Sequence, residues 1–301
     1  LKLSKAELDG FLKSQSIDEV SERKGRLAFT RSEPSQLRRL ALVHEVGEKI
    51  FQGDISDFDP SDLPSGSFKV RREKLTDEET GKDIESKLGS IIGSEKRPVD
   101  LENPEEVYKI YIREDEDIIV RIVEDIDRSL FEQRSNEKRP FSSPVSLDPV
   151  LARVMINLAE VPPGEHVIDP FCGTGGILIE AGLCGIGVKG SDVSEEMVKG
   201  ARKNLEEYGI LNHDIRNNGV EEAADSFGES FDAVITDLPY GQSSKIEGAP
   251  VKYFSENWSR FADKAVFCYD KPELNGMESS FEIYIHNNLT RYLYVMREVD
   301  R

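Results

Sequence analysis

The sequence contains little cysteine or histidine, and it lacks long apolar runs. Its 3 cysteines, Cys172, Cys184 and Cys268, are widely spaced and form no CxxC pair, which argues against both a disulfide framework and a thiolate zinc site. The 4 histidines show no HExxH spacing, so we expect no bound metal. No apolar run reaches the ~18 residues of a membrane span, and the first residues do not resemble a secretion signal. We therefore expect a soluble cytoplasmic protein without a membrane partner.

Positive charge is also scarce, because the formal net charge is -19. Residues 1–140 contain 25 Lys and Arg against 32 Asp and Glu, whereas residues 141–301 contain 14 against 26. This acidity is unusual for a protein that binds phosphates, which normally relies on Lys and Arg. The basic residues of the front portion nevertheless form two clusters, Lys69, Arg71, Arg72 and Lys74 and then Arg128, Arg134, Lys138 and Arg139. Each cluster is either an ordinary solvated face or a patch for an anionic partner.

From about residue 145 onward, helix-like and strand-like segments alternate. Asp148 is a typical N-cap, and Pro149 suits the first position of a helix. Ser194 begins another helix, in which apolar residues recur at helical spacing up to Gly209. The pattern also predicts a strand at 166–169, a helix at 176–184 and strands at 187–192, 231–236, 265–268, 281–285 and 292–296. This alternation predicts an α/β fold with an open, Rossmann-like sheet.

The first 140 residues are organised differently, because strands and helices mix with acidic loops that contain Ser and Pro. A linker is expected near residue 60. Residues 68–127 are typical of one α+β module, with strands at 68–71, 107–112 and 118–123 and an amphipathic helix at 84–92. The chain begins without methionine, in helix-like residues, so we expect it to lack a leading strand.

A glycine-rich turn at 167–176, with the sequence VIDPFCGTGG, joins a predicted strand to a predicted helix. At this place in a parallel sheet, glycines let the backbone approach a ligand, and the helix N-terminus offers free amide donors. No Lys follows Gly176, which excludes a nucleoside-triphosphate loop, and the glycine spacing does not match GxGxxG. The Asp-x-x-Cys-Gly-Thr-Gly pattern resembles the methyl-donor loop of class I methyltransferases.

Asp192 lies about 20 residues past that loop, at the end of the next predicted strand, where an acidic residue would accept the ribose hydroxyls of an adenosyl group. Asp192 could instead cap the following helix. Asn218 is our candidate for a contact with the adenine amino group. The resemblance to class I methyltransferases implies that S-adenosylmethionine would contact Asp169, Phe171, Gly173, Thr174, Gly175, Asp192, Val193 and Asn218.

The segment Asp237-Leu238-Pro239-Tyr240 follows a predicted strand and resembles the [Asp/Asn/Ser]-Pro-Pro-Tyr motif of enzymes that methylate exocyclic base nitrogens. An exocyclic amino lone pair is delocalised into the ring, so hydrogen bonds to the Asp237 carboxylate and the Leu238 carbonyl would localise it. Pro239 would fix the turn, and Tyr240 would stack on a base turned out of its helix. The alternative is an ordinary turn at the end of a strand.

Over nearly its whole length, the chain resembles the archaeal THUMP-domain tRNA (guanine(10)-N(2))-methyltransferases. Besides the two catalytic motifs, the resemblance rests on Phe68-Lys69-Val70-Arg71, on residues 99–104 (VDLENP), on Arg139-Pro140-Phe141 and on residues 143–149 (SPVSLDP). It implies a ferredoxin-like domain at 1–60, a THUMP domain at 61–140 and a class I methyltransferase domain at 141–301.

The same resemblance implies methylation of guanosine 10 in tRNA, with one or two methyl groups. It implies RNA contacts by Lys69, Arg71, Arg72, Lys74, Arg134, Lys138 and Arg139. Members of the family also pair with a small zinc-binding activator subunit through an edge of the catalytic sheet. Two alternatives stay open: an N-methyltransferase that acts on another RNA or DNA base, and an RNA-binding protein without catalysis.

Overall fold

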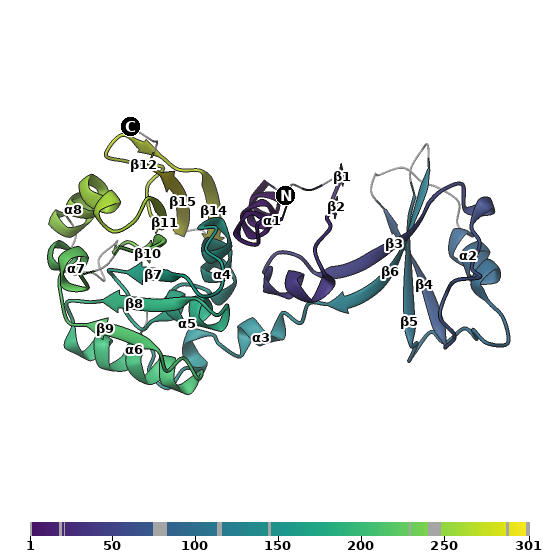
Figure 1. Ribbon diagram of the computed structural model, residues 1–301, viewed down its shortest axis with the longest axis horizontal. Helices are drawn as coiled ribbons and strands as arrows, with labels where there is room; N and C mark the ends of the chain where they lie inside the picture. The colour runs from purple at the N-terminus through teal and green to yellow at the C-terminus, as the bar shows by residue number, and fades with distance from the viewer. Residues whose placement is uncertain are drawn as a thin grey trace. The chain divides into compact units, whose positions relative to one another are not determined.

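The computed structural model describes residues 2–17, 20, 22–74, 83–112, 116–143, 146–228, 230–239, 248–286 and 289–298. The chain divides into two compact units (Figure 1). The larger unit contains Leu1–Glu19, Arg39–Leu42 and Arg128–Arg301, and the smaller unit contains Val20–Arg38 and Val43–Asp127. In the part of the chain that is described, no helix combines the length and apolar composition of a bilayer-crossing segment.

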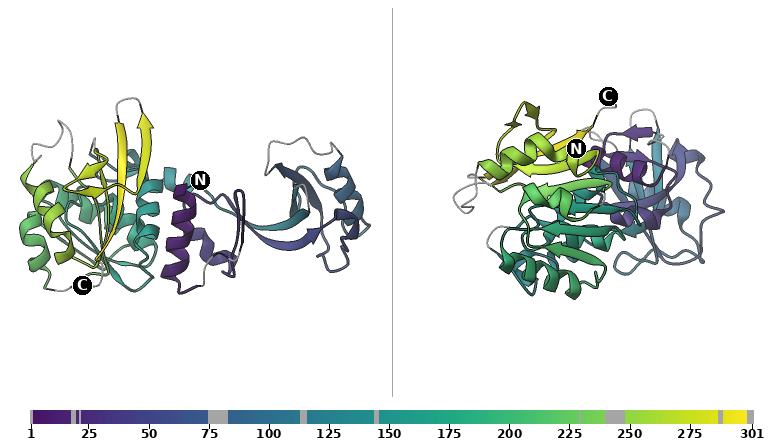
Figure 2. Two further views of the ribbon diagram at one scale, coloured as in Figure 1. Left: turned by 90° about the horizontal axis from the view of Figure 1, so that it is seen from above. Right: turned by 60° about the vertical axis from the view of Figure 1, so that its left-hand side comes forward.

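The larger unit is built on a 7-stranded sheet with the order β14-β15-β11-β10-β7-β8-β9. Five neighbouring strands are parallel: β7 (His166–Asp169), β8 (Gly187–Ser191), β9 (His213–Arg216), β10 (Ala233–Asp237) and β11 (Lys264–Tyr269). Two antiparallel strands, drawn in yellow in Figure 2, extend the sheet beyond β11, namely β14 (Phe281–His286) and β15 (Leu289–Arg297). The predicted α/β sheet is therefore confirmed, as a mixed sheet.

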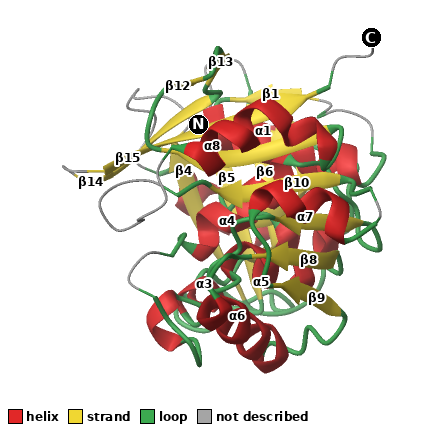
Figure 3. Cartoon of the chain, turned by 90° about the vertical axis from the view of Figure 1, so that its left-hand side faces the viewer, coloured by secondary structure: helices red, strands yellow, loops and turns green. Residues whose placement is uncertain are grey.

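Helices cover both faces of this sheet (Figure 3). One face packs against α4 (Pro149–Leu158), α5 (Gly176–Leu183) and α6 (Glu195–Glu207), and the other against α7 (Val220–Ser226) and α8 (Ala249–Asn257). The predicted cap of α4 is confirmed, because the Asp148 carboxylate accepts hydrogen bonds from the amides of Val150 and Leu151. The remaining elements of this region are α3 (Ser129–Glu132), η3 (Asn136–Lys138), η4 (Trp258–Arg260), β12 (Glu273–Leu274) and β13 (Met277–Glu278).

The strand order reverses between β7 and β10. From β7 the chain continues through β8 to β9 on one side, and it then returns to β10 and β11 on the other side. In open α/β sheets, ligands bind at the carboxyl ends of the strands beside such a reversal. We therefore expect a ligand to bind near Asp169 and Asp237, the last residues of β7 and β10.

The N-terminal helix α1 (Lys2–Ser14) is a layer of the larger unit and packs against α4. The buried Glu7 carboxylate accepts hydrogen bonds from the Ala41 amide (2.7 Å), the Leu42 amide (2.9 Å) and the Asn157 side chain (2.8 Å). A side chain at Gly10 would overlap the carbonyl oxygen of Asn157, so glycine permits the close crossing of the two helices. These contacts explain why α1 belongs with residues more than a hundred positions away.

The smaller unit is a 4-stranded sheet with the order β3-β6-β5-β4. Its strands are β3 (Glu45–Gly53), β4 (Phe68–Lys74), β5 (Glu106–Ile112) and β6 (Asp117–Asp125). The helix α2 (Ile84–Ile92) packs on one face, and the hairpin of β1 (Glu22–Lys24) and β2 (Leu27–Phe29) packs on the other. Short helical turns are η1 (Pro34–Arg39) and η2 (Ile55–Asp57). The strands and the helix predicted within 68–127 are confirmed.

The two compact units differ from the predicted division at residues 60 and 140. Strands β3 and β4 lie on either side of residue 60 and belong to one sheet, because β6 and β5 connect them by backbone pairing. Helix α1 and residues 39–42 lie in the larger unit. Local sequence patterns do not reveal either fact, since both depend on contacts between distant segments. The naming of the front part as ferredoxin-like and THUMP domains stays a prediction.

Candidate active site

A cavity of about 330 Å³ lies in the larger unit, at the carboxyl ends of β7 and β10. Nine of the residues predicted from the sequence line it: Asp169, Phe171, Gly173, Thr174, Asp192, Val193, Asp237, Leu238 and Pro239. The fold thus brings together two motifs that are about seventy residues apart in the sequence. The role of each residue stays a prediction.

Asp169 ends β7 at the centre of the site, where it is 2% exposed. Its Oδ1 accepts hydrogen bonds from the Thr236 hydroxyl (2.6 Å) and from the Phe171 amide (3.1 Å). Burial raises the pKa of Asp169 to about 7, although these two donors lower it. Asp169 therefore titrates near neutral pH, and a cation in the cavity would favour its ionised form.

Asp192 follows β8 and connects the glycine loop to α6. Its Oδ2 accepts a hydrogen bond from the Gly173 amide (3.0 Å), and its Oδ1 accepts one from the Ser194 amide (2.9 Å). The N-cap of α6 is Ser194, whose hydroxyl accepts from the Met197 amide. Of the two interpretations of Asp192, the capping role thus belongs to Ser194, and Asp192 lies on the cavity wall. Burial raises the pKa of Asp192.

Gly175 and Asn218 were predicted to contact the methyl donor, but neither is among the residues that line the cavity. Gly175 adopts a left-handed φ of 81° as the N-cap of α5, and a side chain on it would meet Ala201 of α6. The side of Gly175 that would carry a side chain thus points toward α6. The left-handed conformation of this residue nevertheless determines the path of the loop. Asn218 lies between β9 and α7, and the described cavity lining there consists of Val220 and Glu221 instead.

Asp237 ends β10 and carries the second motif. Its Oδ2 accepts a hydrogen bond from Arg291 Nη1 at 2.6 Å, and the two side chains are 16% and 7% exposed. Its Oδ1 is buried and has no hydrogen-bond partner within the described residues. Burial raises the pKa of Asp237, whereas the charge and the hydrogen bond of Arg291 lower it.

Leu238 is fully buried, and its amide donates to the Cys268 carbonyl (3.0 Å), which fixes the turn. Tyr240 lies outside the described residues.

Sequence reasoning missed several residues of the site. Arg291 lies on β15 and was overlooked because no motif surrounds it, so only the pairing of β15 with β11 brings it to Asp237. The cavity is also lined by residues to which the sequence analysis assigned no contact: Ser143, Ser146, Leu147, Pro170, Cys172, Gly176, Ile177, Met197, Val220, Glu221 and Pro250. Ser143, Ser146 and Leu147 fall within the junction at 143–149, which the family resemblance had singled out.

Asn204 of α6 fastens Phe141, two residues before that junction, to the glycine loop. It is fully buried, and its Oδ1 accepts a hydrogen bond from the Phe141 amide (2.9 Å). Its Nδ2 donates to the carbonyls of Phe141 (2.8 Å) and Thr174 (2.9 Å). Phe141 packs so closely on Gly200 that a side chain there would overlap its ring. One amide thus holds two segments that meet at the cavity.

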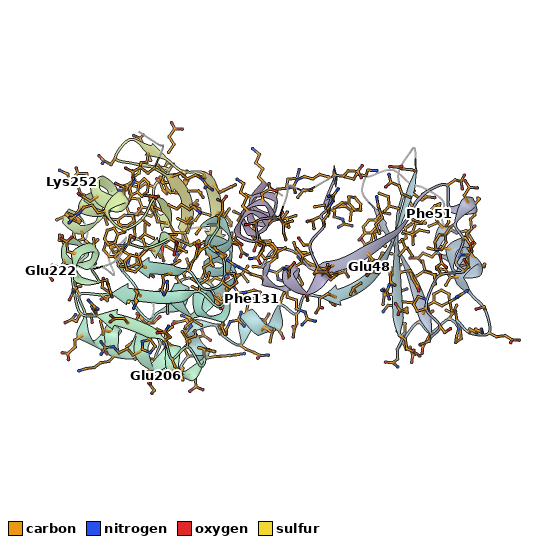
Figure 4. All side chains as sticks on the ribbon, viewed as in Figure 1. Glu48, Phe51, Phe131, Glu206, Glu222 and Lys252 are labelled. Atoms are coloured by element: carbon orange, nitrogen blue, oxygen red, sulfur yellow. The ribbon has the colours of Figure 1, made fainter. Side chains whose placement is uncertain are left out.

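The basic residues predicted to contact RNA fall into two groups. Arg134 makes two hydrogen bonds to the buried Glu180 (2.6 and 3.2 Å). The guanidinium groups of Arg134 and Arg153 both lie over the ring of Phe131, and Phe131 is labelled in Figure 4. Arg139 is 5% exposed and donates to the Arg134 carbonyl and the Ser146 hydroxyl. Both guanidinium groups make hydrogen bonds inside the larger unit, and their predicted contact with RNA stays a prediction.

The remaining basic candidates are more accessible. Lys138 is exposed. Lys69, Arg71 and Arg72 lie on β4, an edge strand of the smaller sheet, where Arg71 is exposed and the other two are half-buried. The side chain of Lys74 lies outside what the structure describes. The three cysteines are free thiols, and the described residues contain no group of three or more His, Cys, Asp and Glu that could hold a metal ion.

Comparisons with known proteins identify the family. Residues 136–266 match a family described as RMKL-like, methyltransferase domain. A tRNA (guanine(10)-N2)-dimethyltransferase of Methanothermobacter thermautotrophicus is 34% identical over 285 residues, which cover 87% of this chain and 84% of the relative. A tRNA (guanine(10)-N2)-dimethyltransferase of Pyrococcus abyssi is 32% identical over 281 residues, which cover 86% and 84%. The chain belongs to this dimethyltransferase family.

Solved structures agree on the fold of this dimethyltransferase family member. TrmN from Thermus thermophilus aligns with a TM-score of 0.55 at 21% identity, over 93% of this chain and 91% of that chain. A possible methylase from Clostridium difficile aligns with a TM-score of 0.56 at 14% identity, over 99% and 96%. The resemblance inferred from the motifs is therefore confirmed at the level of the family, and the structural neighbours support the fold alone.

Proposed function

We propose that this chain transfers methyl groups from S-adenosylmethionine to the exocyclic N2 of guanosine 10 in tRNA, first one and then a second. The observation that carries the proposal is Asp237 Oδ1, a buried carboxylate oxygen on the cavity wall without a hydrogen-bond partner in the described residues. Burying such an acceptor unpaired costs about 1–3 kcal/mol, so the site is built for a ligand that donates a hydrogen bond.

The residues of the cavity fit the methyl donor. Asp169 and Asp192 are two carboxylates that line the cavity, and burial raises the pKa of both, so a cationic ligand would favour their ionised forms. Apolar side chains, Val193 and Val220 among them, offer surface for an adenine ring. The amides at the start of α5 and the Asp192 carboxylate would hold the amino-acid and ribose ends. When bound, the donor supplies an electrophilic methyl group on its sulfonium.

The protein's own groups would activate the acceptor. The amino protons of the base donate to Asp237 Oδ1 and to the Leu238 carbonyl, so the nitrogen lone pair turns toward the methyl carbon. Transfer would form the new N–C bond as the C–S bond of the donor breaks, and the leaving thioether would keep the electron pair of that bond. Asp237 then takes up the proton that the nitrogen loses. The Arg291 contact leaves Oδ1 available for this role, because it occupies Oδ2.

The smaller unit, in this proposal, binds the tRNA as the THUMP and ferredoxin-like part of the chain. Lys69 and Arg71 of β4 support this role, since they alternate along the strand with the buried Phe68 and Val70 and lie on the sheet face opposite to α2. We further propose that the enzyme works in the cytoplasm. The described edge strands β9 and β14 are the places where a small zinc-binding activator subunit would add a strand.

The test compares wild-type protein with Asp237→Asn and with the control Asp225→Asn, which changes an exposed carboxylate on α7. With tRNA transcripts and labelled donor, we expect Asp237→Asn to lose at least about a hundredfold in kcat and to keep its donor affinity. Mass spectrometry of the nucleosides should show N2-methylguanosine and N2-dimethylguanosine. A tRNA with inosine at position 10 lacks the amino group and should stay unmodified.

Other outcomes would decide for the alternatives. Methylation of the inosine-containing tRNA at the normal rate would assign another base. Binding of tRNA and donor by the wild-type protein without any methylated product would indicate an RNA-binding protein without catalysis.

A further inference from the structure

The guanidinium of Arg291 is the group that holds the candidate catalytic carboxylate in place. It reaches from β15 across the position of β11 to Asp237 on β10, where its Nη1 donates to Oδ2 at 2.6 Å. The Arg291 side chain is only 7% exposed, and a buried arginine in contact with a carboxylate restricts the orientations of both groups. The sequence motif that ends in Tyr240 does not include this residue.

The contact distinguishes the two oxygens of Asp237. The last torsion of an aspartate has a broad, two-fold preference, so an unrestrained carboxylate could present either oxygen to the cavity. Here Oδ2 is taken by Arg291, whereas Oδ1 has no partner in the described part of the chain. Asp237 is also the last residue of β10, and the register of this strand is fixed there because Asp237 pairs with Cys268 of β11.

We propose that Arg291 is a positioning residue for methyl transfer: it holds Oδ2 of Asp237 and thereby aims Oδ1 at the amino group of the target base. The inference rests on the proposed function and deepens it. Arg291 itself does not touch the substrate, since it acts through Asp237.

The electrostatic surroundings make this role measurable. The titratable groups that face Asp237 are Arg291 from β15, Asp169 from β7 and Cys268 from β11. Burial raises the pKa of Asp237, and the charge of Arg291 opposes that rise. The charge of Asp237 also raises the pKa of Asp169, so the two carboxylates repel each other when both are ionised. Loss of the positive charge should therefore raise the pKa of Asp237 and move the acid limb of the rate profile to higher pH.

The experiment uses the full-length variants Arg291→Gln and Arg291→Lys, with Arg297→Gln as the matched control. Arg297 lies on the same strand and pairs with Glu160, away from the cavity lining. We expect Arg291→Gln to move the acid limb of kcat up by about 1–3 pH units and to lower kcat at neutral pH about a hundredfold. In Arg291→Lys, the acid limb of kcat should stay at the wild-type pH and part of the rate should be recovered. The KM for tRNA should change little in both variants.

A readout without turnover separates this inference from the proposed function. The carboxyl carbon of Asp237, assigned by its loss in Asp237→Asn, can be titrated by NMR in the protein without tRNA. A higher pKa in Arg291→Gln than in wild type supports the inference whichever base is methylated. An unchanged carboxyl titration and an unchanged acid limb would overturn it, even if the variant is less stable. If Arg291→Gln does not fold, the same two measurements are made on Arg291→Lys. A changed pKa of Asp237 in this variant, which retains the positive charge, would contradict the proposed role of Arg291.

Discussion

At the scale of single residues, Asp169 is the group whose protonation should matter most near neutral pH. It is 2% exposed, burial raises its pKa to about 7, and its Oδ1 is already occupied by two donors. A carboxyl group whose pKa rises on folding contributes stability at low pH, and that contribution is lost as the pH increases through its folded pKa. For Asp169 this contribution therefore declines from the ordinary pKa of 3.8 up to about pH 7 and is absent above it, at the position where the donor would bind.

Donor affinity should consequently increase with pH. A cationic donor favours ionised Asp169, so binding below about pH 7 should release a proton, and the affinity should rise up to about tenfold per pH unit there. Isothermal titration calorimetry in buffers of different ionisation enthalpy measures both quantities. Asp169→Asn should bind more weakly with a flatter pH dependence. Equal affinity of the wild type at pH 6 and pH 8, without proton release, would contradict this assignment.

At the scale of elements, α6 does more than cover the sheet. Asn204 holds the Phe141 backbone and the Thr174 carbonyl together, and Ser194 and Asp192 connect the start of the same helix to the glycine loop. The helix thus positions the loop and the junction against each other, and both line the cavity. Damage to this fastening should weaken donor binding even though Asn204 itself lies outside the described lining.

The substitution Asn204→Asp tests this fastening because it preserves shape and removes the two hydrogen bonds that Nδ2 donates. The buried Thr174 carbonyl and the partly buried Phe141 carbonyl would lose their donor and face a charge, so we expect a loss of about 2–5 kcal/mol in the free energy of unfolding. Donor affinity should fall at least about tenfold. Thermal denaturation and fluorescence titration measure the two effects. The control Asn212→Asp makes the same change at an exposed position and should alter neither quantity.

The elements also show how far the sequence alone could predict the molecule. Helices with local start signals, such as α4 after Asp148 and α6 after Ser194, were predicted because capping depends on a few neighbouring residues. The glycine-rich turn and the Asp237 motif could be expected to lie close together, because the carboxyl ends of parallel strands meet at one edge of a sheet. The place of α1 and the contact of Arg291 with Asp237 could not be predicted, since both depend on packing and register between distant segments.

At the scale of the whole molecule, the chain runs from the larger unit into the smaller one and back more than once. Residues 1–19 and 39–42 belong to the larger unit, where Glu7 joins them to Asn157. Deleting the first 140 residues would therefore remove part of the larger unit's own packing, including Arg134 and its buried partner contact with Glu180. A clean test of the smaller unit must leave the whole chain in place.

Charge reversal on β4 is such a test. Lys69 and Arg71 lie on the sheet face opposite to α2, so the double substitution Lys69→Glu with Arg71→Glu should weaken tRNA binding. It should also reduce the slope of log affinity against log salt concentration by about 2, because about one phosphate contact is lost per residue. Filter binding over a range of salt concentrations measures the slope, and calorimetry should show unchanged donor affinity. The matched control Lys87→Glu changes an exposed lysine on α2 and should leave the slope as it is. A loss in Lys87→Glu about half that of the double variant, in proportion to its smaller change of charge, would mean that tRNA senses only the net charge of the chain, which is already -19.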